Sequence, residues 1–259
     1  MKRLITEAIL LLMLAGCAGA PPLQTEQPQS QQAATSEAGQ RAKVHTELGG
    51  LYLSQGNLGV ALEEARKALA ASSSYAPAHS LMGLIHMQMR ENAAAEESYE
   101  RALRLAPNDP EINNSYGWFL CQTGRERRAL DLFQIALKSP LYSTPSLAYT
   151  NAGICSLRLQ DDRAAEEYFM RALRLDPAND RAAYFLADIS FRQGRLAQAR
   201  QYLNELHKRA EPSVETLWLS VRIERRLGER DLEARLSAQL RRRFPDAPET
   251  KRMLQGQYD

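Results

Sequence analysis

The sequence has few cysteines and few aromatic residues, and its charges nearly cancel. Three cysteines in 259 residues are too few for a fold held together mainly by disulfide bonds. Aromatic residues make up 7% of the chain, so one class that β-strands favour is scarce, whereas alanine, leucine, arginine and glutamate, which favour helices, are abundant. The net charge of +2 gives the whole chain no strong attraction to nucleic acids or membranes. We therefore expect an all-α protein.

The N-terminal hydrophobic run is too short to span a membrane, which takes about 20 apolar residues. It covers residues 8–14 and follows a basic start at residues 1–3, a pattern typical of a secretory signal peptide. A cysteine directly after Leu14-Ala15-Gly16 resembles the lipobox of bacterial lipoproteins. The resemblance implies that residues 1–16 are removed and that lipid is attached to the sulfur and the new amino group of Cys17. The alternative is an ordinary cleaved signal that leaves an unmodified thiol.

Residues 17–41 are predicted to be the lipidated cysteine and a flexible tether. The segment after Cys17 is rich in proline, glutamine, serine, threonine and alanine, so it cannot bury enough surface to offset the entropy lost on ordering. A flexible chain of this length reaches about 25–30 Å. Ala18 follows the cysteine, and under enterobacterial sorting rules the absence of aspartate there favours the outer membrane. We expect a domain on the periplasmic face of the outer membrane, anchored by its N-terminal lipid.

An internal repeat occupies most of the remaining chain. Small residues, mostly glycine, recur at the eighth position of units that are 34 or 36 residues apart, at Gly49, Gly83, Gly117, Gly153 and Ala187. Alanine recurs at positions 20 and 27, and proline closes several units at position 32. This pattern resembles the tetratricopeptide repeat. It predicts a C-terminal tail at 248–259 after six repeats over 42–247, with boundaries at 42–75, 76–109, 110–143, 146–179, 180–213 and 214–247.

Each repeat is expected to form a hairpin of two helices, A and B. Small residues at positions 8 and 20 let the two helices approach closely, and large residues near position 24 fill the space between neighbouring hairpins. Proline at position 32 ends helix B because it lacks an N–H group. Pro140 and Pro145 lie in the lengthened junction between the third and fourth repeats and favour an extended connection there. The resemblance implies an all-α, right-handed superhelix of six tetratricopeptide-type helical hairpins.

The sequence offers no recognisable catalytic or metal site. Neither a glycine-rich phosphate loop after a strand nor a nucleophile elbow is present. The histidines do not cluster with cysteines or acids at metal-ligand spacing, and a structural role is favoured for them: His45, His79, His86 and His207. We therefore expect a non-enzymatic protein without a cofactor or metal, which binds neither nucleic acid nor a small-molecule substrate.

Cys121 and Cys155 are predicted to form a disulfide between the third and fourth repeats. They lie at positions 12 and 10 of helix A in adjacent repeats, and adjacent A helices pack side by side in such a superhelix. An exported protein meets an oxidising compartment. The bond would contribute roughly 3–4 kcal/mol in the chain-entropy model. The alternative is two buried, reduced thiols.

The inner face of the first three repeats is a candidate partner-binding groove. In a superhelix of this kind, helix A lines the concave face, which here mixes large apolar groups with amides and hydroxyls. Such a surface suits an amphipathic helix or an extended segment of a partner. The alternative for Trp118 and Met87 is simple packing against a neighbouring helix. The predicted groove residues are Thr46, Leu53, Ser80, Leu84, Met87, Asn114, Trp118 and Gln122.

Arginines gather on helix A of the last two repeats. This basic end would fit an acidic partner surface or a lipid headgroup, and the alternative is a solvated face with Glu224, Glu229 and Asp231 nearby. The arginines concerned are Arg181, Arg192, Arg222, Arg225 and Arg226, followed by Arg241, Arg242 and Arg243.

Two strings are more specific than the repeat itself. One extends from Glu111 to Cys121 and contains Asn-Asn-Ser-Tyr-Gly-Trp-Phe-Leu-Cys; the other joins residues 142–145 to Asn151-Ala152-Gly153-Ile154-Cys155-Ser156. With the lipobox, the six repeats and a Phe-Pro ending at residues 244–245, they resemble the type IV pilus biogenesis and stability lipoproteins of the PilW/PilF family. They match the branch of that family that carries both cysteines.

The resemblance implies a pilotin. Such a lipoprotein binds secretin subunits of the type IV pilus and promotes their localisation and multimerisation in the outer membrane, and it also influences pilus stability. The family's groove in the first repeats is implicated in partner binding, which here corresponds to helix A of repeats one to three. The alternative is a different periplasmic adaptor lipoprotein, serving outer-membrane protein assembly or a cell-wall hydrolase.

Overall fold

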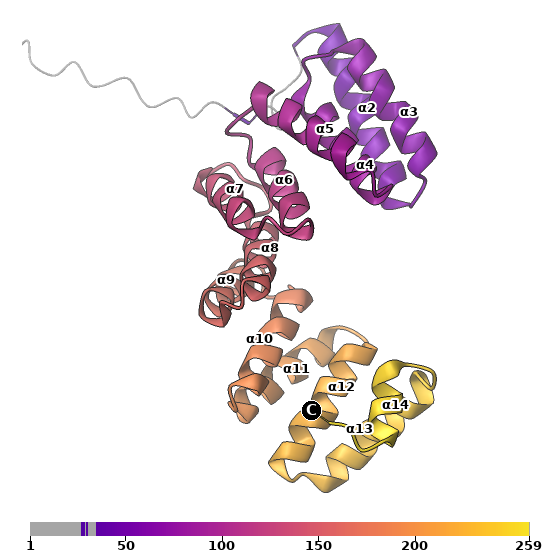
Figure 1. Ribbon diagram of the computed structural model, residues 1–259, viewed down its shortest axis with the longest axis vertical. Helices are drawn as coiled ribbons and strands as arrows, with labels where there is room; N and C mark the ends of the chain where they lie inside the picture. The colour runs from indigo at the N-terminus through magenta and orange to yellow at the C-terminus, as the bar shows by residue number, and fades with distance from the viewer. Residues whose placement is uncertain (1–26, 29, 31–34, 259) are drawn as a thin grey trace, which may run out of the picture.

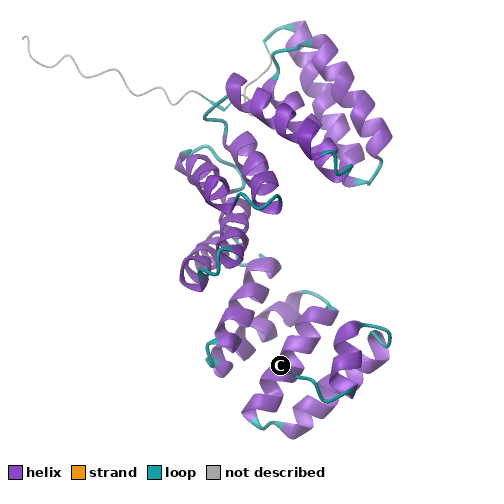
Figure 2. Ribbon diagram, viewed as in Figure 1, coloured by secondary structure: helices purple, strands orange, loops and turns teal. Residues whose placement is uncertain are grey.

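The computed structural model describes residues 27, 28, 30 and 35–258 of the chain. Within these residues it contains thirteen helices and no strand, which confirms the predicted all-α fold (Figures 1 and 2). The predicted signal peptide, the lipidated Cys17 and most of the tether lie outside the described residues. None of the described helices has the length and hydrophobicity that a membrane-spanning helix requires.

Twelve of the helices pair into six hairpins, because each A helix packs most extensively on the B helix that follows it. The A helices are α2 (Glu37–Ser54), α4 (Ala76–Gln88), α6 (Pro110–Gln122), α8 (Pro145–Arg158), α10 (Asp180–Arg192) and α12 (Val214–Leu227). The B helices are α3 (Leu58–Ala71), α5 (Asn92–Leu105), α7 (Glu126–Lys138), α9 (Asp162–Leu175), α11 (Leu196–Arg209) and α13 (Arg230–Arg243).

The hairpins stack into a curved rod. Helices α2–α5 and α11–α14 lie at the two ends on the right of Figure 1, whereas α7 and α9 lie on the left. Helices α6 and α8 are on the inner side of the curve, and successive A helices such as α4 and α6 contact one another. The A helices therefore line the concave face, where the predicted groove residues are found.

The first helix starts earlier than the repeat pattern predicts. Helix α2 begins at Glu37 rather than near Ala42, because the Ser36 hydroxyl accepts a hydrogen bond from the Gly39 N–H and caps the helix. The last residues of the predicted tether are thus helical. Before this helix, Pro28 is buried and the Ser30 N–H donates a hydrogen bond to the Asp109 carboxylate (2.8 Å).

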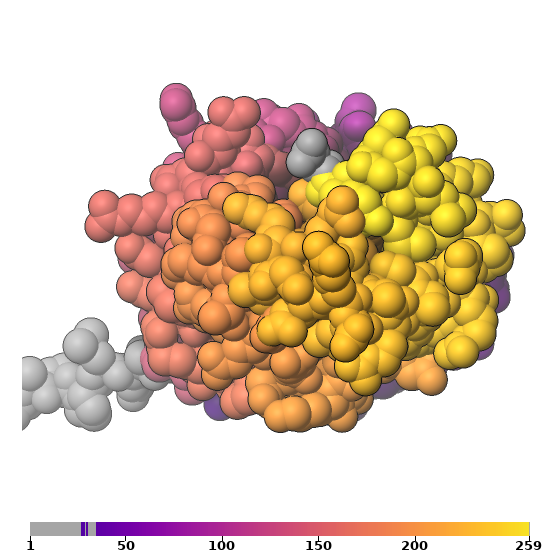
Figure 3. Space-filling model, turned by 90° about the horizontal axis from the view of Figure 1, so that it is seen from below, coloured from indigo at the N-terminus to yellow at the C-terminus, as the bar shows by residue number. Residues whose placement is uncertain are grey.

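The predicted C-terminal tail contains a further helix, α14 (Pro248–Leu254), which contacts α12 and α13. Met253 is buried in a cluster with Leu217, Trp218 and Leu240. Seen from this end, the last helices form a continuous surface (Figure 3). Helix α14 therefore covers apolar side chains of the last hairpin that a seventh repeat would otherwise cover.

Small residues at position 8 allow the first five hairpins to close. A Cβ atom added to Gly153 would lie 2.6 Å from the Phe169 ring, and one added to Gly117 would lie 2.8 Å from the Phe133 ring. The large residue at position 24 thus packs over the glycine of its own hairpin. Phe169 also stacks on Phe185 of the next hairpin, with 5.0 Å between ring centroids, so the same ring fills the space between hairpins as predicted.

The turn from helix A to helix B uses a left-handed residue at position 15. Four hairpins place glycine there with φ of 76° to 80°, whereas Arg90 (φ 63°) and Gln160 (φ 60°) take the position in the other two. The left-handed region costs a residue with a Cβ about 1 kcal/mol or more, whereas glycine adopts it freely.

We expect Gln160→Gly to raise the free energy of unfolding by about 1 kcal/mol, because it removes this backbone strain. Urea denaturation followed by circular dichroism measures the change. Gln193→Gly is the matched control, since Gln193 follows α10 directly with φ of −83° and gains nothing from glycine. Equal stability of the Gln160→Gly variant and the parent would contradict the prediction.

Candidate functional site

The concave face of α2, α4 and α6 carries the predicted groove residues at different depths. Gln122 is exposed, Asn114 is buried, and the half-buried residues are Thr46, Ser80, Leu84, Met87 and Trp118. Leu53 is 5% exposed and packs with Ala61 and Ile85, so it belongs to the core of the first two hairpins and offers no surface to a partner. Leu84 and Met87 also pack against the core cluster of the second and third hairpins. The face is therefore shallower and more polar than the sequence indicates.

Trp118 lies between two hydrophobic clusters. It packs against the cluster around Phe119 and Phe133 and against the cluster around Phe169 and Leu186. The Arg181 guanidinium lies over its indole ring, 5.2 Å from the ring centroid. Trp118 thus connects the third, fourth and fifth hairpins along the inner face, which differs from the free anchor that the sequence suggested as one alternative.

Polar side chains join α6 and α8 on the inner side. The buried Asn151 donates a hydrogen bond to the side-chain oxygen of Asn114, 3.1 Å away. Arg158 donates to the Cys121 carbonyl (2.7 Å) and to the Gln122 side-chain oxygen (2.6 Å). Two of the predicted groove residues therefore hold the third and fourth hairpins in register.

A disulfide joins Cys121 of α6 to Cys155 of α8, with 5.7 Å between the Cα atoms. Both cysteines are fully buried beside Phe119 and Leu120. The bond crosses the junction whose connecting segment is lengthened and contains Pro140. Neither reductant nor oxidant can reach buried sulfurs readily, so the bond is suited to a structural role.

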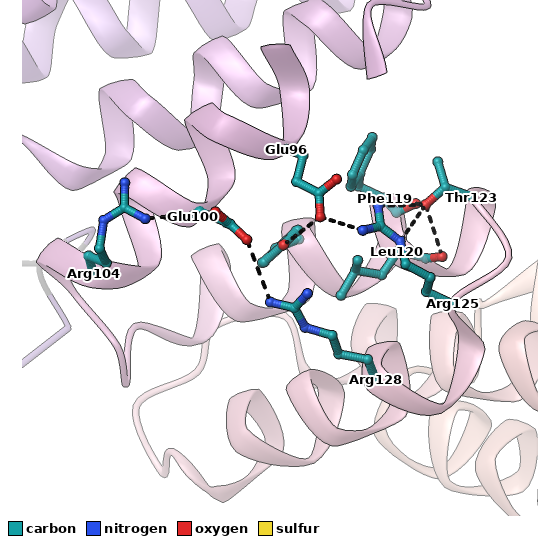
Figure 4. A network of polar contacts seen from close by, with 9 residues as sticks. Glu96, Glu100, Arg104, Phe119, Leu120, Thr123, Arg125 and Arg128 are labelled. Carbon is teal, nitrogen blue, oxygen red and sulfur yellow. Dashed lines mark hydrogen bonds and ion pairs between the residues drawn. The ribbon is translucent and has the colours of Figure 1, made fainter. Parts of the chain in front are cut away.

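Ion pairs join other neighbouring hairpins from position 21 of one repeat to position 16 of the next (Figure 4). Arg125 donates to the Glu96 carboxylate, and the Tyr116 hydroxyl lies 3.5 Å from the same oxygen. The equivalent pair one step along is Arg195 with Glu166, whose atoms are 2.6 Å apart. The contacts tie helix B of one hairpin to the turn of the following one.

Between the fifth and sixth hairpins the two positions exchange their charges, so the basic residue is at position 21 and the acidic residue at position 16. Here Arg200 occupies position 21 and Glu229 occupies position 16, with 3.6 Å between their charged atoms. Arg200 also donates two hydrogen bonds to the buried Glu224 carboxylate, which raise the pKa of its guanidinium. At this junction the charges of the repeat are reversed.

The predicted basic end is largely engaged within the protein. Arg192 pairs with Asp162 and Asp188, and Arg225 pairs with Glu233 at 2.8 Å. Other arginines of the set donate to main-chain carbonyls or to acids of neighbouring helices. These are Arg222 to Tyr258 (2.8 Å), Arg226 to Phe191 (3.2 Å) and Arg243 to Glu211 (3.0 Å).

The histidines make individual contacts. His45 is 2.6 Å from Glu64, whose pKa is lowered by hydrogen bonds from Lys67 and His45. His86 is 2.6 Å from Glu91, and burial lowers the pKa of His207. Across residues 35–258 no group of three or more histidine, cysteine or acidic side chains could hold a metal ion.

The prediction of the groove omitted aromatic side chains of the fourth and fifth repeats. Tyr184 and Phe185 of α10 meet edge to face, 5.4 Å apart, and Phe185 packs against the cluster that includes Trp118. Aligning positions 4 to 6 of helix A across all repeats would have revealed these aromatics, because Tyr149 occupies the same part of α8. The inner face thus continues beyond the first three repeats.

Comparison with known proteins places this architecture in a family. Models described as tetratricopeptide repeat match residues 81–144 and 158–216. The type IV pilus assembly protein PilF of Pseudomonas aeruginosa is 28% identical over 245 residues, which cover 95% of this chain and 96% of PilF. An uncharacterised protein of Haemophilus influenzae is 30% identical over 131 residues, which cover 51% of this chain and 73% of that protein.

Two solved structures show the same fold. The structure of Pseudomonas aeruginosa PilF superimposes with a TM-score of 0.79 at 28% identity, covering 85% of this chain and all of that one. PilW, a widely conserved type IV pilus biogenesis factor, superimposes with a TM-score of 0.76 at 31% identity, covering 82% of this chain and 98% of that one. The similarity thus extends over nearly the full length of both relatives. This chain belongs to the family of tetratricopeptide-repeat proteins that includes PilF and PilW.

Proposed function

We propose that this protein is an outer-membrane lipoprotein that binds secretin subunits and promotes their localisation and multimerisation during type IV pilus biogenesis. The observation that carries the proposal is the similarity to PilF and PilW over nearly their whole lengths. The Leu-Ala-Gly-Cys motif ending at Cys17 supports the lipid anchor. A stack of helical hairpins with an open inner face is a scaffold for binding protein segments, and such scaffolds act without catalytic groups.

In this proposal the protein acts by tethering. The lipid on Cys17 directs the protein to the outer membrane, and the inner face of α2, α4 and α6 holds a secretin segment. Tethering a bound subunit near its destination raises its local concentration, which favours assembly without any chemical step. The exposed Gln122 and the half-buried Ser80 and Thr46 supply polar contacts beside the apolar surfaces of Leu84 and Met87.

The test is secretin assembly in a strain that lacks the protein. Outer membranes are blotted for the detergent-resistant secretin multimer after complementation with the parent or with Cys17→Ala. We expect the multimer to be lost in the deletion strain and the secretin to be mislocalised with Cys17→Ala. Normal multimers in both strains would reject the proposal. Normal pili with a defective envelope would instead indicate an adaptor for outer-membrane protein assembly or a cell-wall hydrolase.

A matched pair of variants tests the position of the binding face. Gln122 on α6 and Gln134 on the B helix α7 are both exposed, so each can be replaced by tryptophan without burying new bulk. Because Gln122 also accepts a hydrogen bond from Arg158, Gln122→Ala, which loses the same bond without adding bulk, is measured beside it. We expect Gln122→Trp to reduce secretin multimers and Gln134→Trp to leave them unchanged. The opposite result would place the binding surface on the B helices.

A further inference from the structure

A cavity of about 380 Å³ opens between α10, the end of α11 and the start of α12. It lies between the fifth and sixth hairpins, and Arg181 at its edge reaches Trp118 of the third hairpin. The residues that matter for its chemistry are Arg181, Tyr184, Phe185, Leu206, Ala210 and Glu215. A cavity of this size accommodates one large side chain and its main chain rather than a whole helix.

Most of the surface inside the cavity is apolar, and its aromatic side chains are held in place. Phe185 is fixed by stacking on Phe169 and by the edge of Tyr184, with ring centroids 5.0 and 5.4 Å apart. Leu206 is buried, so its side chain is fixed by the packing around it. A preformed apolar cavity binds an apolar side chain with little cost in ordering its own residues.

Arg181 lies at this cavity with its guanidinium over the Trp118 ring. The residue is exposed, and partial burial of its guanidinium lowers the pKa of that group, although an arginine stays charged at neutral pH. Among the described residues no carboxylate forms an ion pair with it. Stacking on an indole fixes the plane of a guanidinium and leaves its N–H groups available to an incoming carboxylate.

Three acids line the cavity together with Arg181, and no ion pair joins any of them to it within the described residues. Asp180 pairs with Arg209 (3.1 Å), and Glu211 pairs with Arg243 (3.0 Å). Glu215 accepts a hydrogen bond from the Ser213 hydroxyl (2.7 Å). The site therefore combines an apolar cavity with a cation that is unpaired within the part of the chain that the structure describes.

We propose that this cavity binds an extended acidic segment of a partner protein, with an apolar side chain inside the cavity and an adjacent carboxylate on Arg181. A single oriented guanidinium beside an apolar cavity matches a carboxylate next to a leucine or phenylalanine. Most other arginines at this end are engaged with acids or carbonyls of the protein, so they do not form the broad cationic patch that a lipid surface would require. The cavity lies in the fifth and sixth repeats and adjoins the predicted secretin groove at Trp118, and its binding of a peptide does not depend on the proposed secretin function.

The experiment measures fluorescence anisotropy of a labelled peptide, Gly-Ser-Glu-Leu-Glu-Ser-Gly, with the full chain carrying Cys17→Ser. We expect Arg181→Gln to weaken binding about tenfold or more, because it removes the charge-assisted hydrogen bond. Arg181→Lys should recover part of the affinity, and Ala210→Phe, which fills the cavity, should weaken binding to a similar extent. Arg174→Gln is the matched control, since Arg174 is exposed on the B helix α9. Circular dichroism checks that each variant is folded.

Three outcomes would overturn the proposal. The first is no measurable binding of the peptide by the parent protein. The second is equal affinity of Arg181→Gln and Arg174→Gln, or equal binding of a peptide with glutamine in place of glutamate. The third is loss of binding to phosphatidylglycerol vesicles in Arg181→Gln with peptide binding unchanged, which would assign the cation to a lipid headgroup.

Discussion

Removing the disulfide between Cys121 and Cys155 is expected to lower the free energy of unfolding by roughly 3–4 kcal/mol, because the bond closes a loop across a sequence separation of 34 residues in the unfolded chain. In a stack of repeats each hairpin is stabilised mainly by its neighbours. The bond joins the third and fourth hairpins, so its loss should lower the stability of this part of the stack most.

Urea denaturation of the parent, with and without reductant, is compared with that of the Cys121→Ala/Cys155→Ala variant. The variant should resemble the reduced parent and should not respond to reductant. An Ellman titration of the unfolded parent without reductant should detect no free thiol at these two positions. Two free thiols, or a parent whose stability is independent of reductant, would contradict the prediction.

Phe169→Ala is expected to destabilise the protein by about 3–5 kcal/mol, the usual cost of removing a fully buried ring. Phe169 is fully buried, packs over Gly153 within its hairpin and stacks on Phe185 of the next one. Its removal therefore weakens the hairpin and its junction together. Tyr168→Ala is the control. Because Tyr168 is only half-buried, this change should lower the free energy of unfolding clearly less than Phe169→Ala does.

A double-mutant cycle connects this effect to the glycine beneath the ring. Gly153→Ala alone should destabilise by about 1–3 kcal/mol, because its Cβ would overlap the Phe169 ring. In the Phe169→Ala background the same change should cost much less, since the ring is gone. Additive effects in the double variant would show that the two residues do not act on each other.

The helical architecture was predictable because the repeated sequence pattern follows from the packing requirements inside each hairpin. Position 8 must be small where position 24 is large, and position 15 must adopt positive φ, so these requirements recur along the chain and identify its helices. Gln160 shows that the turn can form without glycine, although the left-handed backbone conformation of a residue with a Cβ costs conformational energy. The chain starts α2 early for a reason outside the repeat, the cap provided by Ser36.

The inner face was less predictable because it depends on contacts between hairpins that are not adjacent. Trp118 and Arg181 belong to the third and fifth repeats, and only the curvature of the rod brings them together. Leu53 occupies a position that the pattern assigns to the groove, yet its side chain reaches the core between α2 and α4. The sequence showed where the arginines are but not their partners, several of which lie 30 to 36 residues away.

The ion pair of Arg200 with Glu229, whose charges are reversed relative to the other two junctions, affects which hairpins can dock on one another. If the sixth hairpin docked on the fourth, Glu229 would face Glu166, and if the third docked on the fifth, Arg125 would face Arg200. Such mispaired stacks would oppose like charges at the junction, whereas the native order opposes unlike ones. The sixth hairpin therefore differs in charge at position 16 from the third and the fifth, which disfavours its docking on the second or the fourth hairpin while the chain is folding.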